Sequence, residues 1–334
     1  MFDLVLDTAP RRVRRTKDGR LIGRAIRPSA GVQAGYEKRL GALVDEMHNS
    51  VIYWLAAAYR RNDERIKALS GIIGDTPGLI WYIDGDEGGS NPTQQFSQLR
   101  EVALRSIGMT PQTRAAQLDP LSSIGALDAR PSADLDEVIR RLRRRWLRRF
   151  DQGAQELARY FAKAVWRRSS AELRQILKRA GFAVEFTPGQ AVKDALAAIV
   201  HTNVSLIRSI PEQHLRQVEA SVMHSVLAGR DLASLSRDLQ DQYGVTRRRA
   251  SFIARDQNNK ATSSINRQQY LDLRIERAIW MHSHAGVQPR PTHVAMDGQE
   301  YDVAKGMWDS HERAWVQPGW LINCRCTSRP ILPR

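Results

Sequence analysis

The sequence predicts an α+β fold that is mainly α-helical and carries a small β-containing C-terminal subdomain. Long stretches between residues 36 and 273 place apolar side chains at steps of three and four residues, the period of a helix buried along one face. Residues 278–334 lack this period and are rich in Trp, His, Pro and Gly, which indicates short strands and turns. The 334 residues suffice for two domains or for one large domain.

Residues 1–35 are expected to form a basic N-terminal arm. Residues 10–28 contain eight Lys or Arg and one Asp, a net charge of +7, and repeated Gly and Pro interrupt any regular element. Such a segment cannot bury enough apolar surface to offset the entropy lost on ordering, so we expect residues 8–30 to be extended or to order only on a partner. The arginines expected to contact a polyanion here are Arg11, Arg12, Arg14 and Arg15.

Residues 36–181 are expected to form a helical region. The apolar period predicts a first helix over about 36–68. The next stretch, residues 70–133, contains several turn sequences rich in Gly and Pro, and we expect it to be irregular apart from a helical piece near 93–107.

The clearest helix is predicted over 134–168, restarting near Ser169 and ending at Gly181, which suits the residue after a last helical turn. Its apolar stripe, expected to pack, comprises Leu135, Ile139, Leu142, Trp146, Phe150, Leu157, Phe161 and Val165. Its basic face, expected to bind nucleic acid, comprises Arg140, Arg141, Arg143, Arg144, Arg145, Arg148 and Arg149.

Residues 182–334 form the third expected region. After a short apolar run, three more helices are predicted, because Pro and Gly disfavour a helix interior. The expected breaks are Pro188, Pro211, Gly229 and Gly244. The last of these helices is expected to begin after Thr246 and to end near Leu273.

The net charge of +15 is concentrated in two segments, residues 10–28 and 134–180, which contribute +7 and +8. Concentrated positive charge attracts polyanions, and double-stranded DNA is the first candidate. The alternative is two solvated faces and an acidic protein partner. No stretch approaches the 18 apolar residues of a membrane helix, and Asp3 and Asp7 interrupt the N-terminal apolar run, so neither membrane insertion nor secretion is expected.

The C-terminal segment contains both cysteines and suggests a zinc site. Cys324 and Cys326 can supply two thiolates and His293 an imidazole, with one of three further side chains completing a tetrahedron. These fourth candidates are His282, His284 and Asp297. The alternative has no cofactor, with buried cysteines beside a turn and hydrogen-bonded histidines; a single C-x-C pair favours this metal-free alternative.

Cysteine catalysis is a third hypothesis for the same residues, with Cys324 as nucleophile, His293 as base and Asp297 as orienting group. No recognisable nucleophile turn or oxyanion hole accompanies them. The sequence also lacks the phosphate loop of ATP-driven motors, the dinucleotide fingerprint and the H-E-x-x-H zinc motif. We therefore expect no enzymatic activity.

Residues 185–330 resemble the phage Mu F-like minor head domain. The run from Gly244 to Arg267 resembles the helix that opens this domain, and Trp280 and several short motifs follow at the expected distances. The residues that carry the pattern are Arg255, Asp256, Gln257, Lys260, Arg290, His293, Asp297, Gly298, Asn323, Cys324 and Cys326. Asp256 and Lys260 are four residues apart, a spacing that predicts an ion pair on the surface of a helix. This helix either packs on the β segment or forms a binding face. Asp297 is expected to accept backbone hydrogen bonds and to be held by Arg290 or His293.

The resemblance implies a minor head protein of a tailed bacteriophage, acting in capsid assembly at the portal or inner capsid. The implied partners are the phage portal protein, the major capsid or scaffold protein and double-stranded DNA. The implied location is the virion, in the head interior or at the portal vertex, with the host cytoplasm as the place of assembly. The rival hypothesis is a stand-alone, non-specific DNA-binding protein, which would explain the charge but not the C-terminal motifs.

Overall fold

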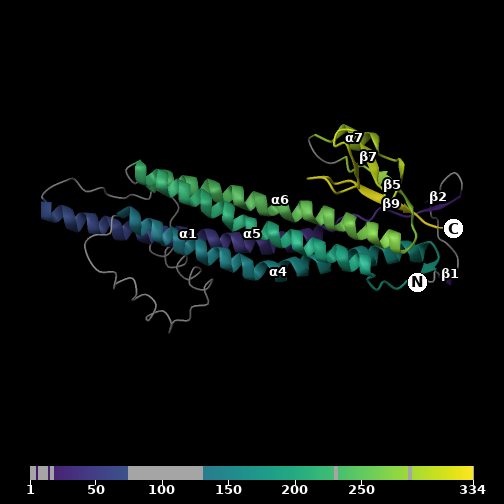
Figure 1. Ribbon diagram of the computed structural model, residues 1–334, viewed down its shortest axis with the longest axis horizontal. Coiled ribbons are helices and arrows are strands. Elements are labelled where there is room, and N and C mark those ends of the chain that lie inside the picture. Colours follow the sequence, from purple (N-terminus) through teal and green to yellow (C-terminus); the bar gives the residue numbers. More distant parts are fainter. Residues whose placement is uncertain are drawn as a thin grey trace, which may run out of the picture. The chain divides into compact units, whose positions relative to one another are not determined.

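The computed structural model describes residues 5–6, 14–15, 19–73, 131–228, 232–284 and 288–333. Within these residues the fold is α+β and mainly helical, as the sequence predicts (Figure 1). The helices are α1 (Ala30–Ile73), α4 (Pro131–Arg179), α5 (Gln190–Leu227), α6 (Leu232–Asp272) and the short α7 (Pro291–Ala295). The helical piece expected near 93–107, and Arg11 and Arg12, lie outside the described residues.

The strands are short, and except for β4 they fall near the two ends of the chain. They are β1 (Val5–Leu6), β2 (Arg14–Arg15), β3 (Leu21–Ile22), β4 (Phe182–Ala183), β5 (Arg277–Met281), β6 (Glu300–Asp302), β7 (Met307–Asp309), β8 (Ala314–Val316) and β9 (Thr327–Ile331). The C-terminal strands confirm the predicted small β-containing subdomain.

Helix α4 follows its apolar pattern closely. Every residue of the predicted stripe is buried, from Leu135 to Val165. The expected restart near Ser169 is wrong, because Ser169 and Ser170 are buried inside one continuous helix and Ser170 accepts a hydrogen bond from Gln269. Gly181 follows the helix with φ +91°, a left-handed conformation that glycine adopts without strain.

Pro211 and Gly244 do not break helices, contrary to expectation. Pro211 lies inside α5 and Gly244 inside α6, so two long helices replace the three predicted. The buried neighbours explain the difference. Ile207 and Ile210 precede the proline and Leu215 follows it, and all three are almost completely buried, so packing offsets the lost backbone hydrogen bond.

The chain forms two compact units, each assembled from several segments. The first contains residues 1–39, 153–206 and 251–334, and the second contains residues 40–152 and 207–250. Each of the four long helices contributes residues to both units.

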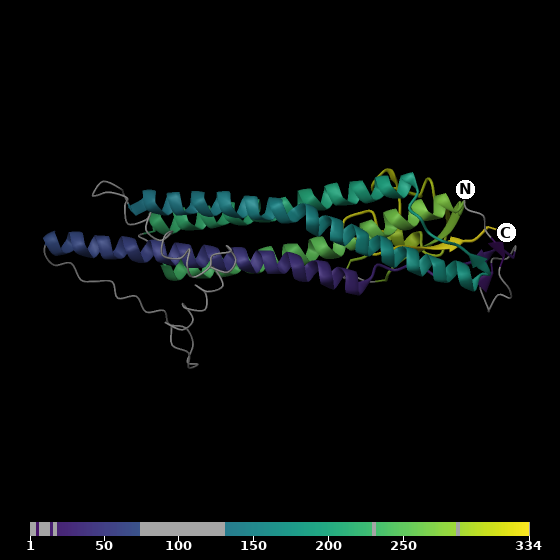
Figure 2. The same ribbon diagram turned by 90° about the horizontal axis from the view of Figure 1, so that it is seen from below.

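The second unit is a bundle of segments from α1, α4, α5 and α6 (Figure 2). Its core includes Val44, Met47, Trp146 and Leu239, all less than 4% exposed. Three polar pairs link its helices: Tyr59 donates to Ser225 at 3.1 Å, Tyr243 donates to Asp45 at 2.8 Å and His214 Nδ1 lies 2.9 Å from the Thr246 hydroxyl. We expect these buried contacts to fix the register of the four helices.

The first unit contains an antiparallel sheet with strand order β2-β3-β9-β5-β6. Strand β9 pairs with β5 along five residues, from Arg277↔Ile331 to Met281↔Thr327. The sheet packs on the ends of α4 and α6 through a shared core that includes Leu173, Tyr270 and Trp280. A separate hairpin, β7–β8, pairs Trp308 with Trp315.

The described part of the basic arm is more ordered than the sequence predicts. Ile22 pairs with Ile331 of β9, Ile26 is 2% exposed, and helix α1 already begins at Ala30. Two arginines of this segment meet carboxylates of the first unit: Arg20 lies 3.2 Å from Glu300, and Arg24 pairs with Glu172. The composition of the arm does not predict these ion pairs, because both acidic partners are distant in sequence.

Lowering the pH from 7 to 5 should destabilise the second unit through His48 and His214. Burial lowers the pKa of each imidazole to about 4, although Asp45 raises that of His48 in part. The unfolded chain binds a proton near pH 6.5, so the contribution to stability is full above that pH and is lost as the pH falls towards 4. We expect about 1–2 kcal/mol per histidine at pH 5, measured by urea unfolding at both pH values.

The control is the double variant His48→Gln, His214→Gln. For each protein we take the difference in the free energy of unfolding between pH 7 and pH 5. A loss of stability that the substitutions cause equally at both pH values cancels in this difference. An undiminished pH dependence in the double variant would contradict the assignment.

Candidate functional site

Two short segments of the first unit carry the cysteine and histidine cluster. Pro291 opens helix α7, which suits a first helical turn because proline has no backbone N–H to leave unpaired, and places His293 in its middle. The two cysteines lie in the loop before β9, where Asn323 adopts a left-handed conformation with φ +58°. Cys324, Cys326 and His293 are at most 5% exposed.

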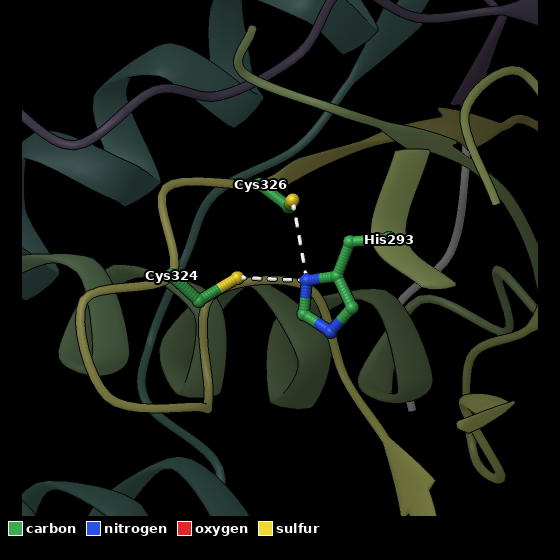
Figure 3. Close-up of side chains that lie close together, drawn as sticks. All are labelled: His293, Cys324 and Cys326. Carbon is green, nitrogen blue, oxygen red and sulfur yellow. Dashed lines mark hydrogen bonds between the residues drawn. The ribbon is translucent and has the colours of Figure 1, made fainter. Parts of the chain in front are cut away.

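The structure brings these three residues together as the sequence predicted. His293 Nδ1 lies 3.4 Å from Cys324 Sγ and 3.6 Å from Cys326 Sγ (Figure 3). All three potential ligand atoms lie within 4.8 Å of one another. One nitrogen of the imidazole thus faces two sulfurs, an arrangement that a hydrogen bond to a single thiol does not require.

Asp309 lies behind His293 and was missed by sequence reasoning. Its Oδ2 is 3.2 Å from His293 Nε2, an ion-pair distance, although the ring N–H is not aligned for a hydrogen bond. Asp309 is completely buried, and it accepts hydrogen bonds from Thr292 and from the backbone N–H of His311. Burial raises the pKa of this carboxyl, but the hydrogen bonds outweigh burial and the net pKa is lowered. The two ring nitrogens therefore face different partners, because Nε2 faces the Asp309 carboxylate and Nδ1 faces the two sulfurs.

The pKa values of the two cysteines are shifted in opposite directions. The pKa of Cys324 is lowered to about 4, chiefly because Cys326 donates a hydrogen bond to it and also because of His293. The pKa of Cys326 is raised by the same hydrogen bond and by burial. Two cysteine sulfurs and one imidazole nitrogen are thus gathered at one point, and this is a donor set that zinc prefers.

The three expected fourth ligands are placed differently from this cluster. His284 Nε2 lies 3.0 Å from Asp297 Oδ2, and Asp297 Oδ1 accepts the His282 backbone N–H at 2.7 Å. Asp297 thus accepts a backbone hydrogen bond as predicted, but its holder is His284 and neither Arg290 nor His293. Arg290 instead donates to the Ile322 carbonyl. His282 Nδ1 accepts the His284 backbone N–H at 3.1 Å.

An open cleft of about 610 Å³ lies beside the cysteines. Its lining includes both cysteines, His282, His293 and Arg290. The cluster is therefore buried but borders solvent-accessible space on one side.

Helix α6 fixes the cysteine loop through side chains of the resemblance pattern. Asp256 is 5% exposed; its Oδ1 accepts the Asn323 backbone N–H at 2.7 Å, and its Oδ2 lies 2.8 Å from Lys260 Nζ. Asn259, outside that pattern, donates to the Cys324 carbonyl at 3.1 Å. The paired residues of α6 thus support the loop that carries the cysteines, as the packing alternative predicted.

The seven arginines of α4 do not form a single free face. Arg143 lies 3.3 Å from Glu219 of α5, Arg149 lies 3.8 Å from Glu46 of α1, and Arg145 is half-buried, with its pKa lowered by burial. Arg140 and Arg141 pair with exposed acidic residues of their own helix. Arg144 and Arg148, one turn apart, are exposed and have no described carboxylate from another helix within 4 Å; Arg144 lies 3.6 Å from Glu137 of its own helix, and Arg148 donates to the Arg144 carbonyl.

Comparison with known proteins identifies the C-terminal part of the chain. Residues 216–329 match the family described as phage Mu protein F like protein. This is the family that the motifs predicted. The matched segment contains the last third of α5, all of α6 and the cysteine and histidine cluster.

A relative in Haemophilus influenzae (strain Rd), described as an uncharacterized protein, is 30% identical over 141 residues. The alignment covers 42% of this chain and only 30% of the relative, so the chain spans about a third of that protein's length. No solved structure matches the chain significantly. Among the described residues, none of the helices combines the length and apolar character needed to cross a membrane.

Replacing Asp256 with alanine should loosen the cysteine loop. The substitution leaves the Asn323 N–H and the Lys260 ammonium without their shared carboxylate in a buried site. We expect a loss of about 3 kcal/mol in the free energy of unfolding, measured in urea by tryptophan fluorescence. Asp241→Ala, which removes an exposed carboxylate from the same helix, should change stability by less than about 0.5 kcal/mol. Equal losses in the two variants would show that Asp256 has no special role.

Proposed function

We propose that this chain is a minor head protein that acts in phage head assembly at the portal or inner capsid. The match of residues 216–329 to the phage Mu protein F like family carries the proposal, because the family implies phage head morphogenesis. The geometry agrees with an assembly role. Asp256, Lys260 and Asp297 make internal contacts that shape the fold, as expected of a structural component.

A virion protein of this kind should be found in purified particles. The experiment is to purify phage particles, identify their proteins by mass spectrometry, and quantify this chain against the major capsid protein. The proposal predicts a few copies per head, in contact with the portal protein after chemical cross-linking. Absence from particles, together with binding to DNA in the host cell, would favour the stand-alone DNA-binding protein.

We further propose that the chain contacts packaged double-stranded DNA through the exposed arginines of α4. Arg140, Arg144 and Arg148 recur at four-residue steps and therefore lie along one face of the helix. The ion pairs of Arg140 are exposed and worth little, so a phosphate can replace their carboxylates. Arg143 and Arg149 are oriented towards other helices of the second unit.

The double variant Arg144→Gln, Arg148→Gln should weaken non-specific binding to duplex DNA. Each lost phosphate contact should reduce the slope of log affinity against log salt by about 1, because fewer counterions are released. Fluorescence anisotropy over a salt series measures both quantities. The matched control is Arg143→Gln, Arg149→Gln, which removes the same charge from the same helix.

The control variant should lose less affinity and less slope than the Arg144, Arg148 variant. Equal effects of the two variants would mean that net charge alone governs binding. An unchanged slope in both would show that α4 does not contact DNA.

A further inference from the structure

We infer that His293, Cys324 and Cys326 bind one Zn²⁺ ion, held in place through Asp309 and open at its fourth coordination position. The spacing of the cysteines in the sequence favours a metal-free turn, but the three-dimensional arrangement of the four side chains does not. This inference is independent of the proposed role in head assembly.

The two distances from the imidazole nitrogen to the sulfurs match the edges of a zinc tetrahedron. Zn–S bonds of about 2.3 Å and Zn–N bonds of about 2.0–2.1 Å, at tetrahedral angles, separate sulfur from nitrogen by about 3.6 Å. The observed separations from His293 Nδ1 are 3.4 Å to Cys324 and 3.6 Å to Cys326. An ion can therefore enter between the three atoms with little rearrangement of the side chains.

The residue behind the histidine is the one that a metal site requires. Histidines that bind a metal through one ring nitrogen generally present the other to a carboxylate or carbonyl, which fixes the tautomer and strengthens the metal bond. Here Nδ1 faces the sulfurs and Nε2 faces the buried Asp309 carboxylate at 3.2 Å. Thr292 and backbone N–H groups fix that carboxylate in turn. Asp309 is thus a positioning residue.

The choice of zinc follows from the donor atoms. Two thiolates and one imidazole suit Zn²⁺, whereas Mg²⁺ and Ca²⁺ require oxygen ligands. The site also lies in a subdomain of short strands, where a metal bond adds stability that a small core supplies less well.

We infer an open fourth position because, in the described part of the chain, the three candidate ligands are engaged elsewhere. His284 and Asp297 contact each other at 3.0 Å. His282 Nδ1 accepts a backbone N–H, which places the proton of the neutral ring on Nε2 and removes that nitrogen as a ligand. The cleft beside the cysteines gives a water molecule access to the ion.

The test uses the full-length protein, expressed with added zinc and analysed by elemental mass spectrometry. We expect about one zinc per chain, and loss of zinc in Cys324→Ser, Cys326→Ser and His293→Ala. His284→Ala and His311→Ala, which alter exposed histidines next to the site, should retain it. Asp309→Asn should still bind zinc but with about 10- to 100-fold lower affinity in a chelator competition.

A second measurement covers variants that fail to fold. X-ray absorption at the zinc edge of the wild-type protein should show two sulfur ligands, one imidazole nitrogen and one oxygen. Absence of stoichiometric zinc would overturn the proposal, as would zinc retained in the Cys324→Ser, Cys326→Ser double variant. A second imidazole in place of the oxygen would overturn the open fourth position. Alkylation of Cys324 at the same rate with and without a chelator would also contradict zinc binding. It would favour the hypothesis that Cys324 is a nucleophile.

Discussion

The hydrogen bond from the Asn323 backbone to the buried Asp256 carboxylate is the contact on which the C-terminal subdomain depends. Asn323 has a left-handed backbone, and the residues after it turn both cysteines towards His293. A charged acceptor in a buried site makes this bond strong, and Lys260 neutralises the acceptor. A loop with little regular structure is therefore held by α6, the longest element of the segment that matches the phage Mu protein F like family.

The parts of the fold that the sequence predicts correctly are those governed by a single local pattern. The stripe of α4 from Leu135 to Val165 is buried because a long apolar face on one side of a helix leaves water only by packing against other elements. Pro211 and Gly244 were misjudged because helix propensity is local, whereas the packing that sustains α5 and α6 comes from other helices. The basic arm was misjudged for the same reason, since its acidic partners Glu172 and Glu300 are distant in sequence.

In the candidate site, too, the sequence predicts some residues and misses others. Residue chemistry was sufficient to group His293 with the cysteines, because these side chains are rare and concentrated near the C-terminus. It could not find Asp309, whose neighbours resemble those of an ordinary turn. In the basic helix, the number of arginines does not tell which of them can bind a polyanion. Arg143 meets Glu219, whereas Arg148 lies on the exposed face. Charge predicts an affinity for polyanions, and only the arrangement in space assigns it to particular residues.

The central claim is that α6 holds the cysteine loop, and amide hydrogen exchange of the intact wild-type protein tests it most directly. If the claim is correct, the Asn323 amide, which donates to Asp256, and the Cys324 amide, which donates to the Leu321 carbonyl, will be protected to nearly the same free energy as the amides of α6 around residues 253–266. The loop and the helix will then open together. Exchange of these loop amides at the rate of an unstructured peptide, while α6 remains protected, would contradict the account.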